Sequence, residues 1–171
     1  MANPSSQVEE QDLDLIALWI RFDPKRWVAG ALAGLTAGVI MAVVAMALAT
    51  AGGYEVWYPL KLAALPILGG SATELGSSVP GLFVGAIAHE LLCMLLGIVF
   101  SHFAATNSLP ALLGAGLVWG LFSWIFLSNL FFRSFADVTA AEIPRGAALL
   151  CNVVFGLALT SVAGFDRLFR R

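Results

Sequence analysis

Four long stretches of this sequence are almost free of charged side chains, and no other feature restricts its fold as strongly. They comprise residues 27–50, 81–103, 110–132 and 145–165. Glu90 is the one acid inside them, and Arg145, at the start of the last stretch, is the one basic residue. A helix of about 20 residues crosses the roughly 30 Å of hydrocarbon in a bilayer. Each stretch is therefore predicted to span a membrane.

The composition excludes several classes of protein. Hydrophobic residues make up 60% of the chain and charged residues 12%, whereas a soluble domain has about 25% charged residues. The formal net charge of −2 offers no positive field for nucleic acid, so no nucleic-acid partner is expected. Because lipid cannot hydrogen-bond to an exposed backbone, the spans must be helices. We predict an all-α polytopic membrane protein, a four-transmembrane-helix bundle built from two hairpins.

The distribution of Lys and Arg predicts the orientation of the chain. Six of the nine basic residues flank the first and fourth spans: Arg21, Lys25, Arg26, Arg167, Arg170 and Arg171. With four spans, all six lie on one side of the membrane, and basic residues favour the cytoplasmic side. We expect residues 1–26 to be a cytoplasmic segment, residues 27–165 the transmembrane domain, and residues 166–171 a basic cytoplasmic tail.

Two segments outside the spans have features of the membrane–water interface. Apolar residues at helical spacing predict an amphipathic helix over residues 7–22, lying on the inner membrane surface or docking a partner. Trp19, Trp57 and Tyr58 are predicted interfacial anchors. Residues 59–68 are too few to cross the bilayer, so we expect them to lie at the outer interface or to dip in as a re-entrant segment.

Glycines at four-residue spacing predict where helices approach one another closely. They are Gly30, Gly34 and Gly38 in the first span, Gly81 and Gly85 in the second, and Gly116 and Gly120 in the third. Helices in lipid associate through such small residues, which let the backbones meet. The pattern does not say whether the partner helix belongs to the same chain, so other membrane subunits or a second copy are both expected partners, together with membrane lipid.

Polar side chains fall at one predicted depth of the bundle. Counted from the span ends at about 1.5 Å per residue, they lie near the middle of the membrane. This intramembrane cluster comprises His89, Glu90, Cys93, Ser123, Cys151 and Asn152. We expect its members to face protein rather than lipid, because ionisable groups are costly in hydrocarbon. A weak repeat relates His89-x-x-x-Cys93-x-x-x-Gly97 to Asn152-x-x-x-Gly156, which favours two similar hairpins.

Several roles are open to this cluster. Glu90 can hydrogen-bond to His89, Ser123 or Asn152 and fix the helix order, or it can serve with His89 in a proton or ion pathway. The segment His89-Glu90-Leu91-Leu92-Cys93 approaches a zinc-protease motif, but it lacks a third ligand unless Cys151 supplies one. His89 and His102 are roughly 20 Å apart along one helix and cannot hold one haem. No catalytic residues, metal or haem are therefore predicted, although bound lipid is.

The membrane part resembles a family of small bacterial membrane proteins. The features that match are the glycine-rich first span and the segments Tyr58-Pro59-Leu60-Lys61-Leu62, Ala88-His89, Gly116-Leu117-Val118-Trp119-Gly120 and Phe155-Gly156. They resemble the YagU-like four-helix proteins, in which the second helix of each hairpin often carries a His. Here the fourth span has Asn152 instead. The resemblance implies a multi-pass protein of the bacterial inner membrane and no established chemistry.

These observations favour a non-enzymatic integral membrane protein that is a subunit or accessory of a larger membrane assembly. The alternative is a small transporter or a proton or ion pathway centred on His89 and Glu90. A quinone- or haem-linked redox subunit is a further alternative.

Overall fold

A computed structural model describes residues 20–73, 79–127 and 144–171, and every regular element in these ranges is helical. The elements are α2 (Pro24–Ala51), α3 (Tyr58–Ala63), α4 (Leu65–Leu68), η1 (Gly69–Thr73), α5 (Val79–Phe103), α6 (Leu109–Phe126), α8 (Arg145–Ala158), η3 (Leu159–Ser161) and α9 (Val162–Phe169). Four helical stretches are long and apolar enough to cross a membrane: 24–51, 79–103, 109–126 and 145–169. The predicted all-α four-helix fold is confirmed.

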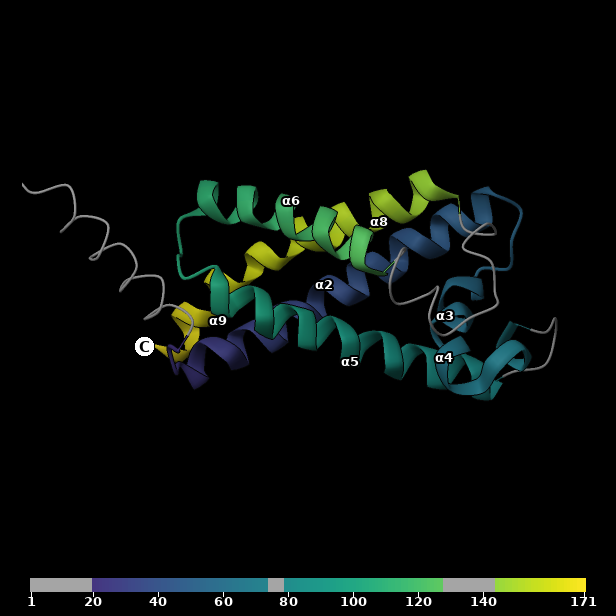
Figure 1. The fold of residues 1–171 in the computed structure, drawn as a ribbon, viewed down its shortest axis with the longest axis horizontal. Helices are drawn as coiled ribbons and strands as arrows, with labels where there is room; N and C mark the ends of the chain where they lie inside the picture. The colour runs from purple at the N-terminus through teal and green to yellow at the C-terminus, as the bar shows by residue number, and fades with distance from the viewer. Residues whose placement is uncertain (1–19, 74–78, 128–143) are drawn as a thin grey trace, which may run out of the picture.

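The four long helices form two antiparallel pairs. Helix α2 packs along α5, α6 packs along α8, and the contact between α2 and α8 joins the pairs. The start of α2, the end of α5, the start of α6 and α9 all lie at one end of the bundle, whereas α3 and α4 lie at the other (Figure 1). Each pair is a hairpin in sequence, as the repeat predicted.

Helix α2 presents two adjacent stripes of small residues to two different partners. Ala29, Ala33 and Ala37 are fully buried and share a core cluster with Phe155, Leu159 and Val162. Gly30, Gly34 and Gly38 face α5: a methyl group on Gly34 would collide with the backbone of Cys93 and Met94. The absence of large side chains on both stripes lets α2 occupy the centre of the bundle.

The first helix begins earlier than the charge pattern predicted. Asp23 is its N-cap and accepts a 3.1 Å hydrogen bond from the backbone N–H of Arg26, while Pro24 occupies the first turn. Proline suits that position because its missing N–H would have no helical partner. Residues 20–23 are not helical, so the predicted amphipathic helix does not reach Phe22. The rest of that helix, with Trp19, lies outside the described residues.

The last span is longer than predicted and is not a uniform α-helix. The 3₁₀ turn η3 separates α8 from α9, and α9 continues to Phe169. Residues 166–169 therefore belong to a helix packed against α2, and the predicted separate tail is reduced to Arg170 and Arg171. The third span is helical from Leu109, and its predicted last residues, 128–132, lie outside the described ranges.

The segment after α2 folds as a short helical cap over the first turns of α5. The carbonyl group of Leu60 lies against Gly85, where a Cβ atom would otherwise be, so a side chain at position 85 would collide with α3. The predicted glycine contact at Gly85 is thus made with this cap and not with another span. Gly81 is buried in the first turn of α5. Trp57 is exposed before α3, and Tyr58 begins it with its ring stacked on Tyr54.

Candidate functional site

Three polar side chains of the predicted cluster lie at the contact between α2 and α5. The Nε2 atom of His89 is 3.1 Å from the carbonyl oxygen of Gly38 and 3.7 Å from the Sγ atom of Cys93. The contact with Gly38 requires the two backbones to be close, which the glycines of α2 allow. His89 is therefore held between its own helix and α2.

Glu90 lies next to His89 but makes no hydrogen bond within the described part of the chain. Its Oε2 atom is buried, while the residue as a whole is half-buried. A methyl group built on Gly38 would lie 2.6 Å from this oxygen, so the carboxyl group occupies the space that the missing side chain leaves. The bonds from Glu90 to His89, Ser123 or Asn152 that the sequence suggested are not formed. A carboxyl group inside a membrane segment thus finds no donor among the described residues.

The other three members of the predicted cluster belong to the second helix pair, Ser123 to α6 and Cys151 and Asn152 to α8. The amide of Asn152 donates to the carbonyl of Ala148 in its own helix at 2.9 Å. The Oγ atom of Ser123 is buried and has no hydrogen-bond partner in the described ranges. Cys151 is buried beside Asn152, and both cysteines are free thiols. The cluster is therefore divided between the two helix pairs.

Although divided, the two groups lie at a similar depth. Arg26 of α2 and Asp166 of α9 form an ion pair at one end of the bundle. Twelve residues from Arg26 lead to Gly38, and twelve residues back from Asp166 lead to Val154. At about 1.5 Å per residue both positions are roughly 18 Å from the ion pair. Asn152 thus lies near the level of Gly38, and hence of the His89 group.

The glycine contacts are equivalent in the two hairpins. In the first, Gly97 of α5 meets the backbone of Gly34, and in the second, Gly156 of α8 meets that of Gly116. A methyl group on Gly120 would lie 3.1 Å from the carbonyl carbon of Asn152. Cys93 and Asn152 therefore occupy corresponding places, each opposite a glycine of the preceding helix.

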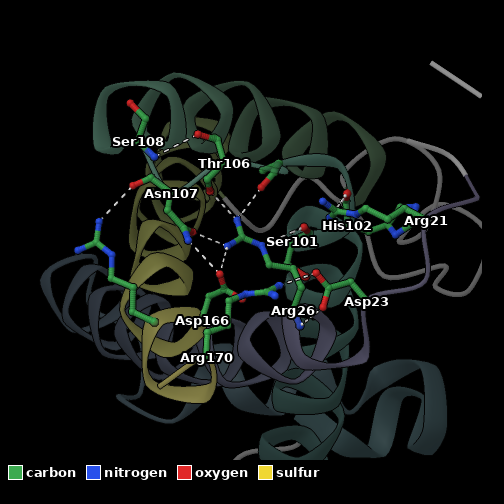
Figure 2. Close-up of polar contacts among 12 residues, drawn as sticks. Arg21, Asp23, Arg26, Ser101, His102, Thr106, Asn107, Ser108, Asp166 and Arg170 are labelled. Carbon is green, nitrogen blue, oxygen red and sulfur yellow. Dashed lines mark hydrogen bonds and ion pairs between the residues drawn. The ribbon is translucent and has the colours of Figure 1, made fainter. Parts of the chain in front are cut away.

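A second polar cluster, which the sequence analysis missed, closes the end of the bundle where α2 begins. The side chains of Arg26 and Asp166 are 4% and 3% exposed, and their Nη1 and Oδ2 atoms are 3.2 Å apart. Asn107 bridges them: its Oδ1 accepts from Arg26, and its Nδ2 donates to Asp166 at 2.9 Å (Figure 2). Charged groups with so little access to water require such pairing.

Arg26 also holds the connection between α5 and α6. It donates to the backbone carbonyls of Ser101, Ala104 and Thr106 at 3.4, 2.7 and 2.6 Å. Arg170 adds a second link by donating to both Asp166 and Asp23 (Figure 2). The sequence indicated only that these charges share a side of the membrane, because nothing local specifies which pairs form.

Electrostatic effects at this end are clearest for the two groups outside the membrane-spanning segments. Partial burial of Asp23 favours its neutral form, but hydrogen bonds from the Arg26 amide and from Arg170 outweigh this and lower the pKa of Asp23 below 3.8. The hydrogen bonds from Arg170 to Asp23 and Asp166 in turn raise the pKa of Arg170. Both groups are therefore charged at neutral pH.

One ion pair lies in the cap at the other end. The Nζ atom of Lys61 in α3 is 2.7 Å from the Oε2 of Glu55, and Lys61 is buried while Glu55 is partly exposed. This pair holds α3 against the loop that follows α2.

The arrangement of potential metal ligands is sparse. In the described ranges no three His, Cys, Asp or Glu side chains lie close enough together to hold a metal ion. Cys151, the third ligand that a zinc site would need, lies on α8, whereas His89 and Cys93 contact α2.

Comparison of the chain with family models, curated proteins and solved structures gives no match.

Proposed function

We propose that this chain is a non-enzymatic subunit or accessory of a larger assembly in a bacterial inner membrane. The observation that carries the proposal is Glu90, a half-buried residue within a membrane-spanning helix whose carboxyl group makes no hydrogen bond in the described part of the chain. Lipid cannot supply a donor, and an unpaired ionisable group in hydrocarbon is costly. A donor from a neighbouring protein chain, either a second copy or another subunit, satisfies it.

The surface beside Glu90 is suited to such a contact. Ile87 is one helical turn before Glu90 and shares its side of α5, and its side chain is 60% exposed. A partner helix packed on Ile87 would cover the open side of Glu90 as well. The six basic residues at the end where α2 begins support a cytoplasmic location for both termini, which a C-terminal reporter with side-dependent activity can test.

Site-specific photo-crosslinking tests the assembly. A photoreactive residue at position 87 should form protein–protein adducts in native membranes, whereas one at Val118 of α6, which is similarly exposed at 66%, serves as the control. Glu90→Leu should remove the adducts, and Glu90→Gln should retain them because an amide both donates and accepts hydrogen bonds. A monomer in mild detergent that forms only lipid adducts from position 87 would contradict the proposal.

A second candidate function is a proton or ion pathway, and the placement of His89 favours it. His89 adjoins Glu90 in sequence and contacts the backbone of a second helix, and an imidazole ring can both accept and release a proton. In this case Glu90→Gln and His89→Ala should abolish a proton flux measured with a pH-sensitive dye in vesicles, whereas Cys151→Ser should not. Glu90→Gln thus separates the candidates, because it preserves assembly but stops proton transfer.

A further inference from the structure

The end of the bundle that carries both described termini has a large positive excess. Residues 20–26 and 166–171 contain six basic and two acidic side chains, an excess of four positive charges. The connection between α5 and α6, residues 104–108, adds no charge. The opposite end carries Lys61, Glu55 and Arg145 in the described ranges, an excess of one.

Both acids at this end form ion pairs with Arg26 or Arg170, and four basic residues are not part of these pairs. Asp166 forms ion pairs with Arg26 and Arg170, and Asp23 forms an ion pair with Arg170. No carboxylate of the described chain pairs with the remaining four, which are Arg21, Lys25, Arg167 and Arg171. Within the described ranges, no ion pair neutralises these four positive charges.

These cations are spread around the bundle rather than gathered on one helix. Arg21 donates to the carbonyl of His102 at the end of α5, at 3.1 Å (Figure 2). Arg167 of α9 donates, at 3.4 Å, to the carbonyl of Asn107 before α6. Lys25 and Arg171 are exposed at the start of α2 and at the C-terminal end of the chain. Cations therefore border the bundle beside several of its helices.

Exposed apolar side chains lie between the cations. Phe22 adjoins Arg21 and is 77% exposed, and Leu168 adjoins Arg167 and is 62% exposed. Alternation of this kind is typical of the level where acyl chains meet headgroups, because long basic side chains extend to phosphates while their apolar neighbours stay in lipid. A water-soluble acidic partner would contact the cations but leave the apolar side chains unaccounted for.

We propose that Arg21, Lys25, Arg167 and Arg171 form a binding surface for anionic phospholipid headgroups. The recognised chemistry is the phosphate, together with the acyl chains that the exposed Phe22 and Leu168 contact. Bound lipid would add anions beside cations that no carboxylate of the described ranges pairs with, and would hold the bundle at a fixed depth. The inference does not depend on the function proposed for Glu90.

Retained lipid provides the test. Purified protein is reconstituted in vesicles of phosphatidylglycerol and phosphatidylcholine at a 1:4 ratio, extracted in mild detergent, and its retained lipids are quantified by native mass spectrometry. The wild type should enrich phosphatidylglycerol. Since one basic residue near an anionic surface contributes about fivefold in affinity, Lys25→Gln or Arg171→Gln should each lower the enrichment by up to about fivefold, and replacing all four with Gln should abolish it.

Three controls make the test specific. Arg145→Gln removes an exposed cation at the other end and should leave the enrichment unchanged, and replacing the three arginines of the surface with Lys should retain it. Inorganic phosphate at 50 mM should not displace the lipid. Equal retention of both lipids by the wild type, full enrichment in the quadruple variant, an equal loss with Arg145→Gln, or displacement by phosphate would each overturn the proposal. If the quadruple variant does not fold, the enrichment measured for Lys25→Gln and Arg171→Gln tests the proposal, and full enrichment in both would overturn it.

Discussion

The Nη1 atom of Arg26 lies 3.2 Å from the Oδ2 atom of Asp166, and both side chains are almost completely buried. This pair joins the first turn of the first long helix to the last helix of the chain. Through Asn107 and the carbonyls of Ala104 and Thr106, it also fixes the connection between the two hairpins. One buried ion pair thus links α2, α5, α9 and the connection that leads into α6.

Removing one partner of this pair should destabilise the protein strongly. Asp166→Ala leaves the Arg26 guanidinium buried without its carboxylate, which costs about 3–5 kcal/mol. Replacing both residues with apolar ones, as in Arg26→Met with Asp166→Leu, should cost less than Asp166→Ala alone. The free energy of unfolding in mixed micelles, titrated with a denaturing detergent, measures the difference. A double variant that is as unstable as the sum of its single variants would argue against coupling between the two side chains.

The glycines of α2 should tolerate no side chain where they meet backbone. Gly34→Ala places a methyl group against the backbone of Cys93 and Met94, so the helices must separate, at a cost of about 1–3 kcal/mol. Gly114→Ala in α6 is the matched control, since no atom lies within 4 Å of the added methyl. There the change should be neutral or stabilise by up to about 1 kcal/mol. Thermal unfolding of both variants in one detergent makes the comparison, and equal effects would refute the packing described.

The two free cysteines should resist alkylation in the folded protein. Cys93 and Cys151 are 4% and 6% exposed, Cys93 at the contact of α5 with α2 and Cys151 on α8. Mass spectrometry after treatment with N-ethylmaleimide should find neither thiol modified in vesicles, and both modified after unfolding in SDS. Gly34→Ala should accelerate modification of Cys93 while leaving Cys151 protected. Rapid labelling of Cys93 in the wild type would show that α2 and α5 are not packed closely.

Stability should depend on pH through Asp23. Since its pKa is lowered by folding, Asp23 contributes stability fully above the ordinary pKa of 3.8, and the contribution is lost as pH falls through the lower folded value. The Tm difference between wild type and Asp23→Asn should therefore be constant above about pH 5 and shrink below pH 3.8. Lys25→Gln, which removes an exposed neighbouring charge outside this network, is the control. A constant difference down to pH 2.5 would exclude the effect.

Much of the fold is predictable from the sequence because the membrane imposes simple rules. The uncharged stretches predict the helices to within a few residues, except where Pro24 and Asp23 begin α2 earlier and where α9 continues past Asp166. Those exceptions occur at the membrane boundary, where hydropathy changes gradually and capping and packing decide the helix ends. Four-residue glycine spacing also indicates which faces meet, since only small side chains permit backbone contact.

The partners of those faces and of the polar groups are decided by tertiary structure alone. Nothing local in the sequence shows that Gly85 receives the cap formed by α3, that Asn152 bonds to its own helix, or that Glu90 finds no donor among the residues that the structure describes. The pairing of Arg26 with Asp166 joins positions 140 residues apart in the chain. Hydropathy is a property of each segment by itself, whereas a hydrogen bond or an ion pair depends on the distance between two segments, and only the packing of the bundle determines that distance.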